Sequence, residues 1–212
     1  MNSAPMQAAL ASLPEGKRLP VLVFLHGCTG IQLEEGTVEE LAPKAGFAVV
    51  FPDSFARKVR ERNCNLGDYS DGQFPAAYPY RWAEAEYVRA RLAEAAWVDQ
   101  DRVVLGGFSE GGIATALYER GSYAGYLVMG WTCHSPRPRM AGLRVPTTAP
   151  LLTVVMVRDP RTDWPGWRGD CGAWMASAAA RSLVIDGAGH GVQSHPEARR
   201  AVRDFLAGFL EP

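Results

Sequence analysis

The sequence has no long run of apolar residues and no excess of charge of either sign. Its longest apolar stretches, Leu19–Leu25 and Leu151–Val157, have the length of a strand, whereas a helix needs roughly 20 apolar residues to cross a bilayer. The 22 Lys and Arg residues nearly balance the 23 Asp and Glu residues, so the basic surplus that binds a phosphate backbone is missing. We therefore expect neither a membrane protein nor a nucleic-acid-binding protein.

Cysteine is scarce, and the N-terminal residues lack the pattern of a signal peptide. The four cysteines, Cys28, Cys64, Cys133 and Cys171, form no CxxC pair and no zinc-type spacing, so no metal site is expected. Residues 1–20 have neither a basic start nor an uninterrupted apolar segment, which predicts a cytoplasmic location. Free buried thiols are the simplest expectation there. A Cys64–Cys171 disulfide between two loop-like segments is the alternative.

The chain does have the length and apolar content for one sizeable core, with 212 residues of which 47% are hydrophobic. We expect a single domain over residues 1–212. Short, continuously apolar runs alternate along it with helical patterns, which is typical of a parallel sheet covered on both faces. This order predicts an α/β fold, a three-layer α/β/α sandwich with a mostly parallel sheet. The predicted strands are Val21–Leu25, Ala48–Phe51, Val103–Gly107, Tyr126–Met129, Leu151–Val157 and Ser182–Ile185. The predicted helices are Val38–Ala45, Arg81–Ala96, Gly112–Arg120, Gly172–Arg181 and Pro196–Leu210.

Two segments, at about 52–80 and 131–150, show no sustained period. The second contains four prolines, at positions 136, 138, 146 and 150, and cannot be helical throughout. Long irregular segments in a compact domain are usually functional. We expect both to form lid-like loops.

The sharpest motif is G-x-S-x-G at Gly107–Gly111, directly after a predicted strand and before a predicted helix. Glycine-rich turns also occur without any catalytic role, but this setting is the one that exposes a nucleophilic serine on a tight turn. A serine hydroxyl needs a base to accept its proton and an acid to orient that base. Ser109 is therefore a candidate nucleophile.

Residues for both partners follow in the chain. His190 comes after the predicted strand Ser182–Ile185 and before the last helix, and is the candidate base; His195, next to Pro196, is expected to be a solvated loop residue. Asp159 and Asp163 both follow the strand Leu151–Val157, and Asp159 is favoured because it stands at the strand's end. The order Ser109, Asp159, His190 is the one expected of an α/β-hydrolase triad.

Two backbone N–H groups are expected to form an oxyanion hole. Glu110 follows the nucleophile, and the turn His26–Gly30 after the first strand offers Cys28, with Thr29 as the alternative donor. His26 is expected to brace this turn rather than to act as a base.

The segments HGCTG, FPDSFARK, WVDQDRVVLGGFSEGG and IDGAGHG together resemble the dienelactone hydrolase family of α/β-hydrolases, over about Val21 to Leu210. The resemblance implies a minimal α/β-hydrolase fold and a Ser/Cys-Asp-His hydrolase of small esters or lactones, with no metal or organic cofactor. Pro150 and Asp159 match the family's spacing around the acid. Ser109 stands where the dienelactone hydrolases proper have a cysteine, and Gly27 stands where they have an acidic residue after the histidine. Both departures favour a serine esterase with an ordinary Ser–His relay.

The expected reaction is hydrolysis of a small carboxylic ester or lactone through an acyl-enzyme. The alternatives are a dienelactone hydrolase or thioesterase, and a catalytically silent α/β-hydrolase that binds a ligand. Trp131, Arg57 and Arg81 are the candidate substrate-binding residues; Thr132, His134, Trp164, Trp167, Arg137 and Arg139 are also available. We expect a small-molecule partner only, and a monomer or homodimer.

Overall fold

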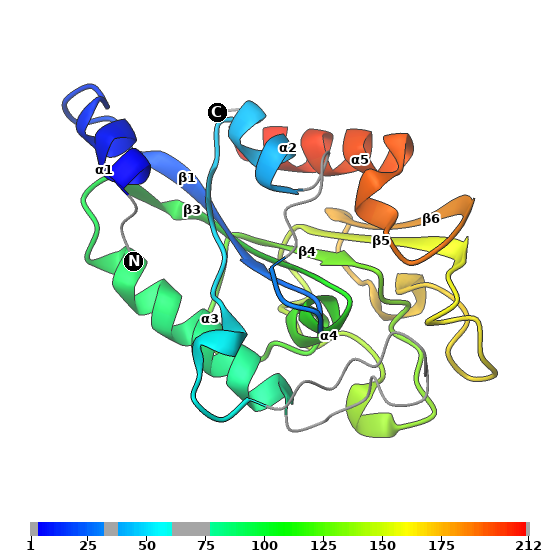
Figure 1. Cartoon of the computed structure of the whole chain (residues 1–212). Helices are drawn as coiled ribbons and strands as arrows, with labels where there is room; N and C mark the ends of the chain where they lie inside the picture. Colours follow the sequence, from blue (N-terminus) through cyan, green and yellow to red (C-terminus); the bar gives the residue numbers. More distant parts are fainter. Residues whose placement is uncertain (1–3, 32–37, 61–76, 211–212) are drawn as a thin grey trace.

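The computed structural model of the protein describes residues 4–31, 38–60 and 77–210. A six-stranded sheet runs through these ranges in the spatial order β2-β1-β3-β4-β5-β6 (Figure 1). Every neighbouring pair is parallel. The predicted strands are therefore confirmed, with different ends. Their bounds are β1 Leu19–Leu25, β2 Ala48–Val50, β3 Val98–Phe108, β4 Gly125–Met129, β5 Leu151–Arg158 and β6 Ala180–Ala188.

Helices cover both faces of the sheet, with α2 and α5 on one side and α3 and α4 on the other (Figure 1). This arrangement confirms the predicted three-layer α/β/α sandwich. No helix in the described ranges is long and apolar enough to cross a membrane. The α-helices are α1 Ala4–Ala11, α2 Val38–Lys44, α3 Ala77–Ala93, α4 Glu110–Ala116 and α5 Pro196–Ala207. Single 3-10 turns are η1 Ser54–Ala56, η2 Pro138–Met140, η3 Gly172–Trp174 and η4 Val192–Ser194.

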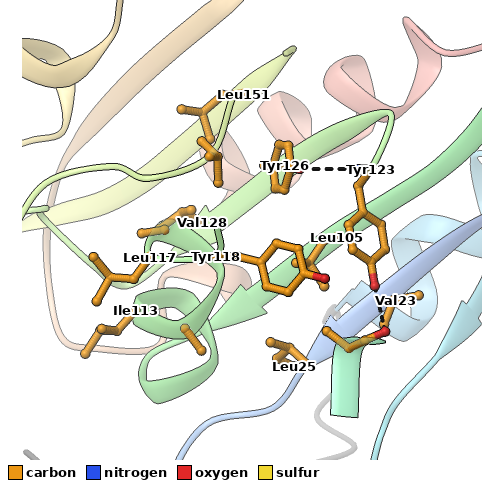
Figure 2. Close-up of a cluster of buried hydrophobic side chains, with 14 of the residues drawn as sticks. Val23, Leu25, Leu105, Ile113, Leu117, Tyr118, Tyr123, Tyr126, Val128 and Leu151 are labelled. Atoms are coloured by element: carbon orange, nitrogen blue, oxygen red, sulfur yellow. Dashed lines mark hydrogen bonds between the residues drawn. The ribbon is translucent and has the colours of Figure 1, made fainter. Parts of the chain in front are cut away.

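The two cores arise because successive residues of a strand point to opposite faces of the sheet. Along β1, Val21, Val23 and Leu25 pack on the side of α3 and α4, whereas Leu22 and Phe24 pack on the side of α2 and α5. Figure 2 shows the first of these cores, where side chains of the central strands meet those of α4. Packing on both faces therefore holds the sheet, and with it the ends of its strands, in place.

The predicted lid-like segments are only partly visible. Of the segment at about 52–80, residues 61–76 lie outside the described ranges, and α3 already begins at Ala77. The segment 131–150 is irregular apart from η2.

The helix predicted over Gly172–Arg181 is wrong. Only the turn η3 forms there, and the chain enters β6 at Ala180, which pairs with Leu151. The alanines favour a helix locally, but Cys171 is covalently tied to Cys133 and its N–H donates to the Ser182 hydroxyl at 3.2 Å. These two ties and the strand pairing leave too little free chain for a helix. In contrast, α1 forms where no helix was predicted.

The expectation of free thiols is also wrong, as is the alternative Cys64–Cys171 pair. Cys171 forms a disulfide with Cys133, with the two Cα atoms 5.0 Å apart, and Cys28 is disulfide-bonded as well. Cys64 lies outside the described residues. Disulfides persist mainly in oxidising compartments, so this chemistry argues against the expected cytoplasmic location.

The Cys133–Cys171 disulfide closes a loop with a sequence separation of 38 and is buried at both sulfurs. We expect the double variant Cys133→Ala/Cys171→Ala to lose about 4 kcal/mol of unfolding free energy, from the chain entropy that the bond removes from the unfolded state. Urea unfolding of both proteins under non-reducing conditions measures the loss. Equal midpoints and slopes would show that the bond adds nothing to stability.

Candidate active site

Ser109 sits on a strained turn between β3 and α4. Its backbone has φ 55° and ψ −117°, outside the regions that non-glycine residues favour. The turn is tight enough to require the flanking glycines. A β-carbon on Gly107 would lie 2.3 Å from the Gly111 carbonyl oxygen, and one on Gly111 would lie 1.9 Å from the Leu25 carbonyl oxygen. Both glycines therefore serve the close approach of α4 to its own strand and to β1.

The structure brings Ser109, His190 and Asp159 into one chain of hydrogen bonds. The Ser109 hydroxyl lies 2.7 Å from His190 Nε2, and His190 Nδ1 lies 2.8 Å from Asp159 Oδ2. A carboxylate only accepts hydrogen bonds, so Nδ1 carries the proton and donates to Asp159. Nε2 is then an acceptor for the serine hydroxyl, which is the protonation pattern that a general base needs.

The environment of Asp159 differs from that of Asp163. Asp159 is fully buried, and its second oxygen accepts the Arg161 N–H at 2.9 Å, so the carboxylate is fixed from two sides. Asp163 pairs with Arg168 at 2.7 Å on the surface, with 46% of its side chain exposed. The structure therefore places the residue favoured by the sequence, and not its alternative, beside His190.

A cavity of about 420 Å³ opens beside Ser109 and His190. One side is formed by the turn after β1, since a β-carbon on Gly27 would lie 3.6 Å from that of Ser109. Cys28 and Thr29, the two candidate oxyanion donors of this turn, line the cavity, and Glu110 begins α4 directly after Ser109. The described residues that line it are Phe24, His26, Gly27, Cys28, Thr29, Gly30, Ile31, Val38, Glu39, Phe51, Phe108, Ser109, Arg161, His190, Gly191 and Gln193.

His26 braces the turn, as expected, and is held in a neutral form. Its Nδ1 lies 2.6 Å from the Gly27 carbonyl oxygen, while Nε2 lies 3.0 Å from both the Ser54 N–H and an Arg81 nitrogen. Two donors at Nε2 require the ring proton to be on Nδ1. Burial, and after it the positive charge of Arg81, lower the pKa of the His26 imidazole from 6.5 to about 4.

The predicted substrate-binding arginines do not face this cavity. Arg81 is fully buried, and Arg57 pairs with Glu84 at 2.8 Å and lies over the Tyr80 ring. Neither is among the described lining residues, whereas Arg161 is. Arg161 could have been found from the sequence, because it lies two residues after Asp159 on the loop that follows β5.

Trp131 is a core residue rather than part of the cavity wall. It is 2% exposed and packs edge-on against Trp167, with the ring centroids 5.5 Å apart. His134 likewise packs against Trp174, and Thr132 donates to the Trp167 carbonyl. Trp164, Arg137 and Arg139 are exposed to solvent and are not among the described lining residues.

His195 caps the N-terminus of α5, where its Nδ1 accepts the Glu197 N–H. Within the described ranges no group of three or more His, Cys, Asp or Glu side chains is arranged to hold a metal ion. The sulfur of Cys133, next to His134, is committed to the disulfide.

The lowered pKa of His26 makes a specific contribution to the pH dependence of stability. The unfolded chain takes up this proton near pH 6.5 and the folded protein only near pH 4, so the contribution is complete above pH 6.5 and is lost as the pH falls toward 4. We expect a loss of about 1 kcal/mol per pH unit in this window and about 3 kcal/mol in total.

Urea unfolding of the wild type and of His26→Asn at pH 7, 6, 5 and 4.5 isolates this contribution from that of other groups. The variant should lose less stability than the wild type over the same range. Parallel pH profiles of the two proteins would contradict the assignment.

Comparison with solved structures identifies the fold that carries these residues. No protein-family model matches the sequence, and no curated protein matches it. A candidate dienelactone hydrolase from Klebsiella pneumoniae superimposes with a TM-score of 0.64 at 15% identity, over 95% of this chain and 90% of that one. A hyperthermophilic esterase from Pyrobaculum calidifontis gives 0.56 at 19% identity, over 92% and 78%. A phospholipase/carboxylesterase from Dyadobacter fermentans gives 0.56 at 16% identity, over 92% of each chain. The chain therefore has the α/β-hydrolase fold, in the form that dienelactone hydrolase-like and carboxylesterase structures share.

Proposed function

We propose that this protein is a serine hydrolase that cleaves small carboxylic esters or lactones. The observation that carries the proposal is the continuous hydrogen-bond chain from Asp159 through His190 to Ser109 at the wall of a cavity. Ser109 stands on a strained turn that presents its hydroxyl to this space. Strain of this kind persists where the surrounding structure enforces it, and it is common at catalytic residues.

In the first half of the reaction, the Ser109 oxygen attacks the carbonyl carbon while His190 Nε2 takes the hydroxyl proton. The carbonyl oxygen becomes an oxyanion, which the backbone N–H groups of Cys28 and Glu110 stabilise. The intermediate collapses as the C–O bond breaks, and His190 returns the proton to the leaving alcohol. Asp159 stays ionised and stabilises the imidazolium that forms.

In the second half, a water molecule enters and gives its proton to His190 as its oxygen attacks the acyl carbon. The oxyanion forms again in the same place, and its collapse returns the proton to Ser109 and releases the carboxylic acid. In a lactone the leaving hydroxyl remains attached to the acyl group, so the product is a single hydroxy acid.

The cavity favours compact, partly apolar substrates. Its volume of about 420 Å³ lies at the lower end of the range for small-molecule sites. Phe24, Phe51 and Phe108 supply apolar wall, and Arg161 and Gln193 supply polar groups. Solved structures that share this fold are described as esterase, dienelactone hydrolase and phospholipase/carboxylesterase, which agrees with acyl-transfer chemistry.

We expect Ser109→Ala to lower kcat for p-nitrophenyl butyrate by about 1,000-fold or more, because the variant has no nucleophile to acylate. Initial rates at 400 nm measure the effect. Ser12→Ala, which removes an exposed hydroxyl in the turn after α1, serves as the control and should keep full activity. Undiminished turnover by Ser109→Ala would refute the proposal.

A fluorophosphonate probe separates an enzyme from a catalytically silent relative of the same fold. It should label the wild type at Ser109 and leave Ser109→Ala unlabelled. Matched ester, lactone and thioester substrates with one acyl chain then rank the three hydrolase activities. Absence of labelling in the wild type would favour the silent, ligand-binding alternative.

The two aspartates on one loop provide a matched pair. Asp159→Asn leaves the His190 tautomer unsupported and should lower kcat by roughly 100- to 10,000-fold. Asp163→Asn removes only a surface ion pair and should change kcat by no more than about twofold. Steady-state kinetics of both variants, with circular dichroism to verify folding, decide the assignment. Equal losses in the two variants would overturn it.

A further inference from the structure

A buried polar cluster lies behind the turn that follows β1, and most of it is hidden from the cavity. We call it the Arg81 cluster. All its side chains are less than one-tenth exposed, and only His26 is among the described lining residues. Its members are His26, Ser54, Arg60, Arg81, Glu84 and Glu110. Burying this many charges costs desolvation free energy, which their mutual contacts must offset. These contacts show which parts of the backbone the cluster holds in place.

The first arm of the cluster runs from Arg81 to the Cys28 amide. Arg81 donates to the His26 carbonyl oxygen and, at 3.0 Å, to His26 Nε2. His26 in turn donates from Nδ1 to the Gly27 carbonyl oxygen at 2.6 Å. The Gly27 carbonyl and the Cys28 N–H belong to one planar trans peptide unit and point in opposite directions. Fixing the carbonyl therefore fixes the direction of the Cys28 N–H.

The second arm runs from Arg81 to Glu110. The Glu110 carboxylate lies 3.8 Å from Arg81 Nε and 2.6 Å from an Arg60 nitrogen. Glu110 is the first residue of α4, and its backbone N–H directly follows Ser109. The hydrogen bond from Arg60, with the Arg81 charge beside it, restrains the Glu110 side chain and so supports the position of the second proposed oxyanion donor.

Helix α3 supplies the fixed point from which both arms extend. Glu84, three residues after Arg81 on the helix, accepts from Arg81 at 3.3 Å and from the Ser54 hydroxyl at 3.0 Å. The two terminal nitrogens of the Arg81 guanidinium serve His26 and Glu84 at once, because its donors are arranged in a rigid planar fork. Its Nε has no hydrogen-bond partner among the described residues and acts on Glu110 through its charge. A lysine has one nitrogen and cannot reach them together.

We infer that Arg81 is a positioning residue that aims both backbone donors of the oxyanion hole, Cys28 N–H and Glu110 N–H. This inference rests on the proposed function. It gives a role to a fully buried arginine that a sequence-based interpretation would assign to substrate binding. Arg81 itself touches neither the substrate nor the reacting atoms.

The principal test compares Arg81→Gln with Arg89→Gln on the same helix. Arg89 is also a hydrogen-bonded arginine of α3, and its partner is Gln100 on β3. It lies about two helical turns after Arg81, away from the turn after β1. For Arg81→Gln we expect kcat to fall by about 100-fold with KM changed less than about threefold, because the donors act on the transition state. Arg89→Gln should match the wild type. Arg81→Lys should not restore the rate.

Phosphonylation of Ser109 separates positioning from a general loss of folded protein. A positioning defect slows labelling of Arg81→Gln but leaves its end point at one phosphonyl group per chain. A partly unfolded population lowers the end point and leaves the rate of the remaining fraction unchanged, which would overturn the inference. A kcat for Arg81→Gln within threefold of the wild type would overturn it as well. Failure of the wild type to be labelled would instead refute the proposed function.

Two variants of His26 test the first arm, and decide the matter if Arg81→Gln does not fold. Asparagine can place a donor where His26 has Nδ1 and so keep the bond to the Gly27 carbonyl. Glutamine places its amide where His26 has Nε2 and loses that bond. The kcat of His26→Asn should therefore exceed that of His26→Gln by about tenfold or more, while both variants reach the same labelling end point. Equal kcat values would show that the Gly27 carbonyl need not be fixed.

Discussion

The close approach of the start of α4 to the end of β1 is the constraint on which the site depends. There is room only for hydrogen where the α-carbon of Gly111 meets the Leu25 carbonyl oxygen, since a β-carbon would lie 1.9 Å away. The approach forces Ser109 into its strained conformation and brings the turn after β1 alongside it. A larger side chain at this point would push Ser109 away from the turn after β1, and so from the donors of the proposed reaction.

A tight turn alone does not orient backbone donors, and here the structure adds a second element, the Arg81 cluster. Burying its arginines and glutamates costs desolvation free energy, which their ion pairs and hydrogen bonds offset. The buried charges are concentrated where β1, α3 and α4 converge, next to the candidate site. A rigid polar frame at this junction suits the proposed reaction, in which charge develops on one oxygen, because preorganised donors need not move when that charge appears.

The irregular connection after β5 is also held in place by contacts between distant segments, in this case by a disulfide bond. The chain leaves Asp159 and reaches β6 without an α-helix, and the Cys133–Cys171 bond ties it to the segment that follows β4. The alanine-rich sequence at Gly172–Arg181 predicts a helix from local propensity alone. The prediction fails because local propensity carries no information about the disulfide. The same limit applies to Arg81. An arginine with a glutamate three residues later on a helix is typical of an exposed ion pair, so the sequence gives no sign that Arg81 will be buried.

The sequence by itself determined the alternation of strands and helices, the turn at Ser109, and the order of Ser109, Asp159 and His190. These features are local, because each depends on periodicity, on glycine at fixed offsets, or on a position just after a strand. Only the tertiary structure decided that Asp159 rather than Asp163 faces His190, that Cys133 pairs with Cys171, and that Trp131 belongs to the core. It also decided that Arg81 donates to His26 in the turn after β1 while Arg161 faces the cavity. These outcomes depend on which segments distant in sequence meet in space, and burial and partner choice exist only once the sheet has brought its strand ends together.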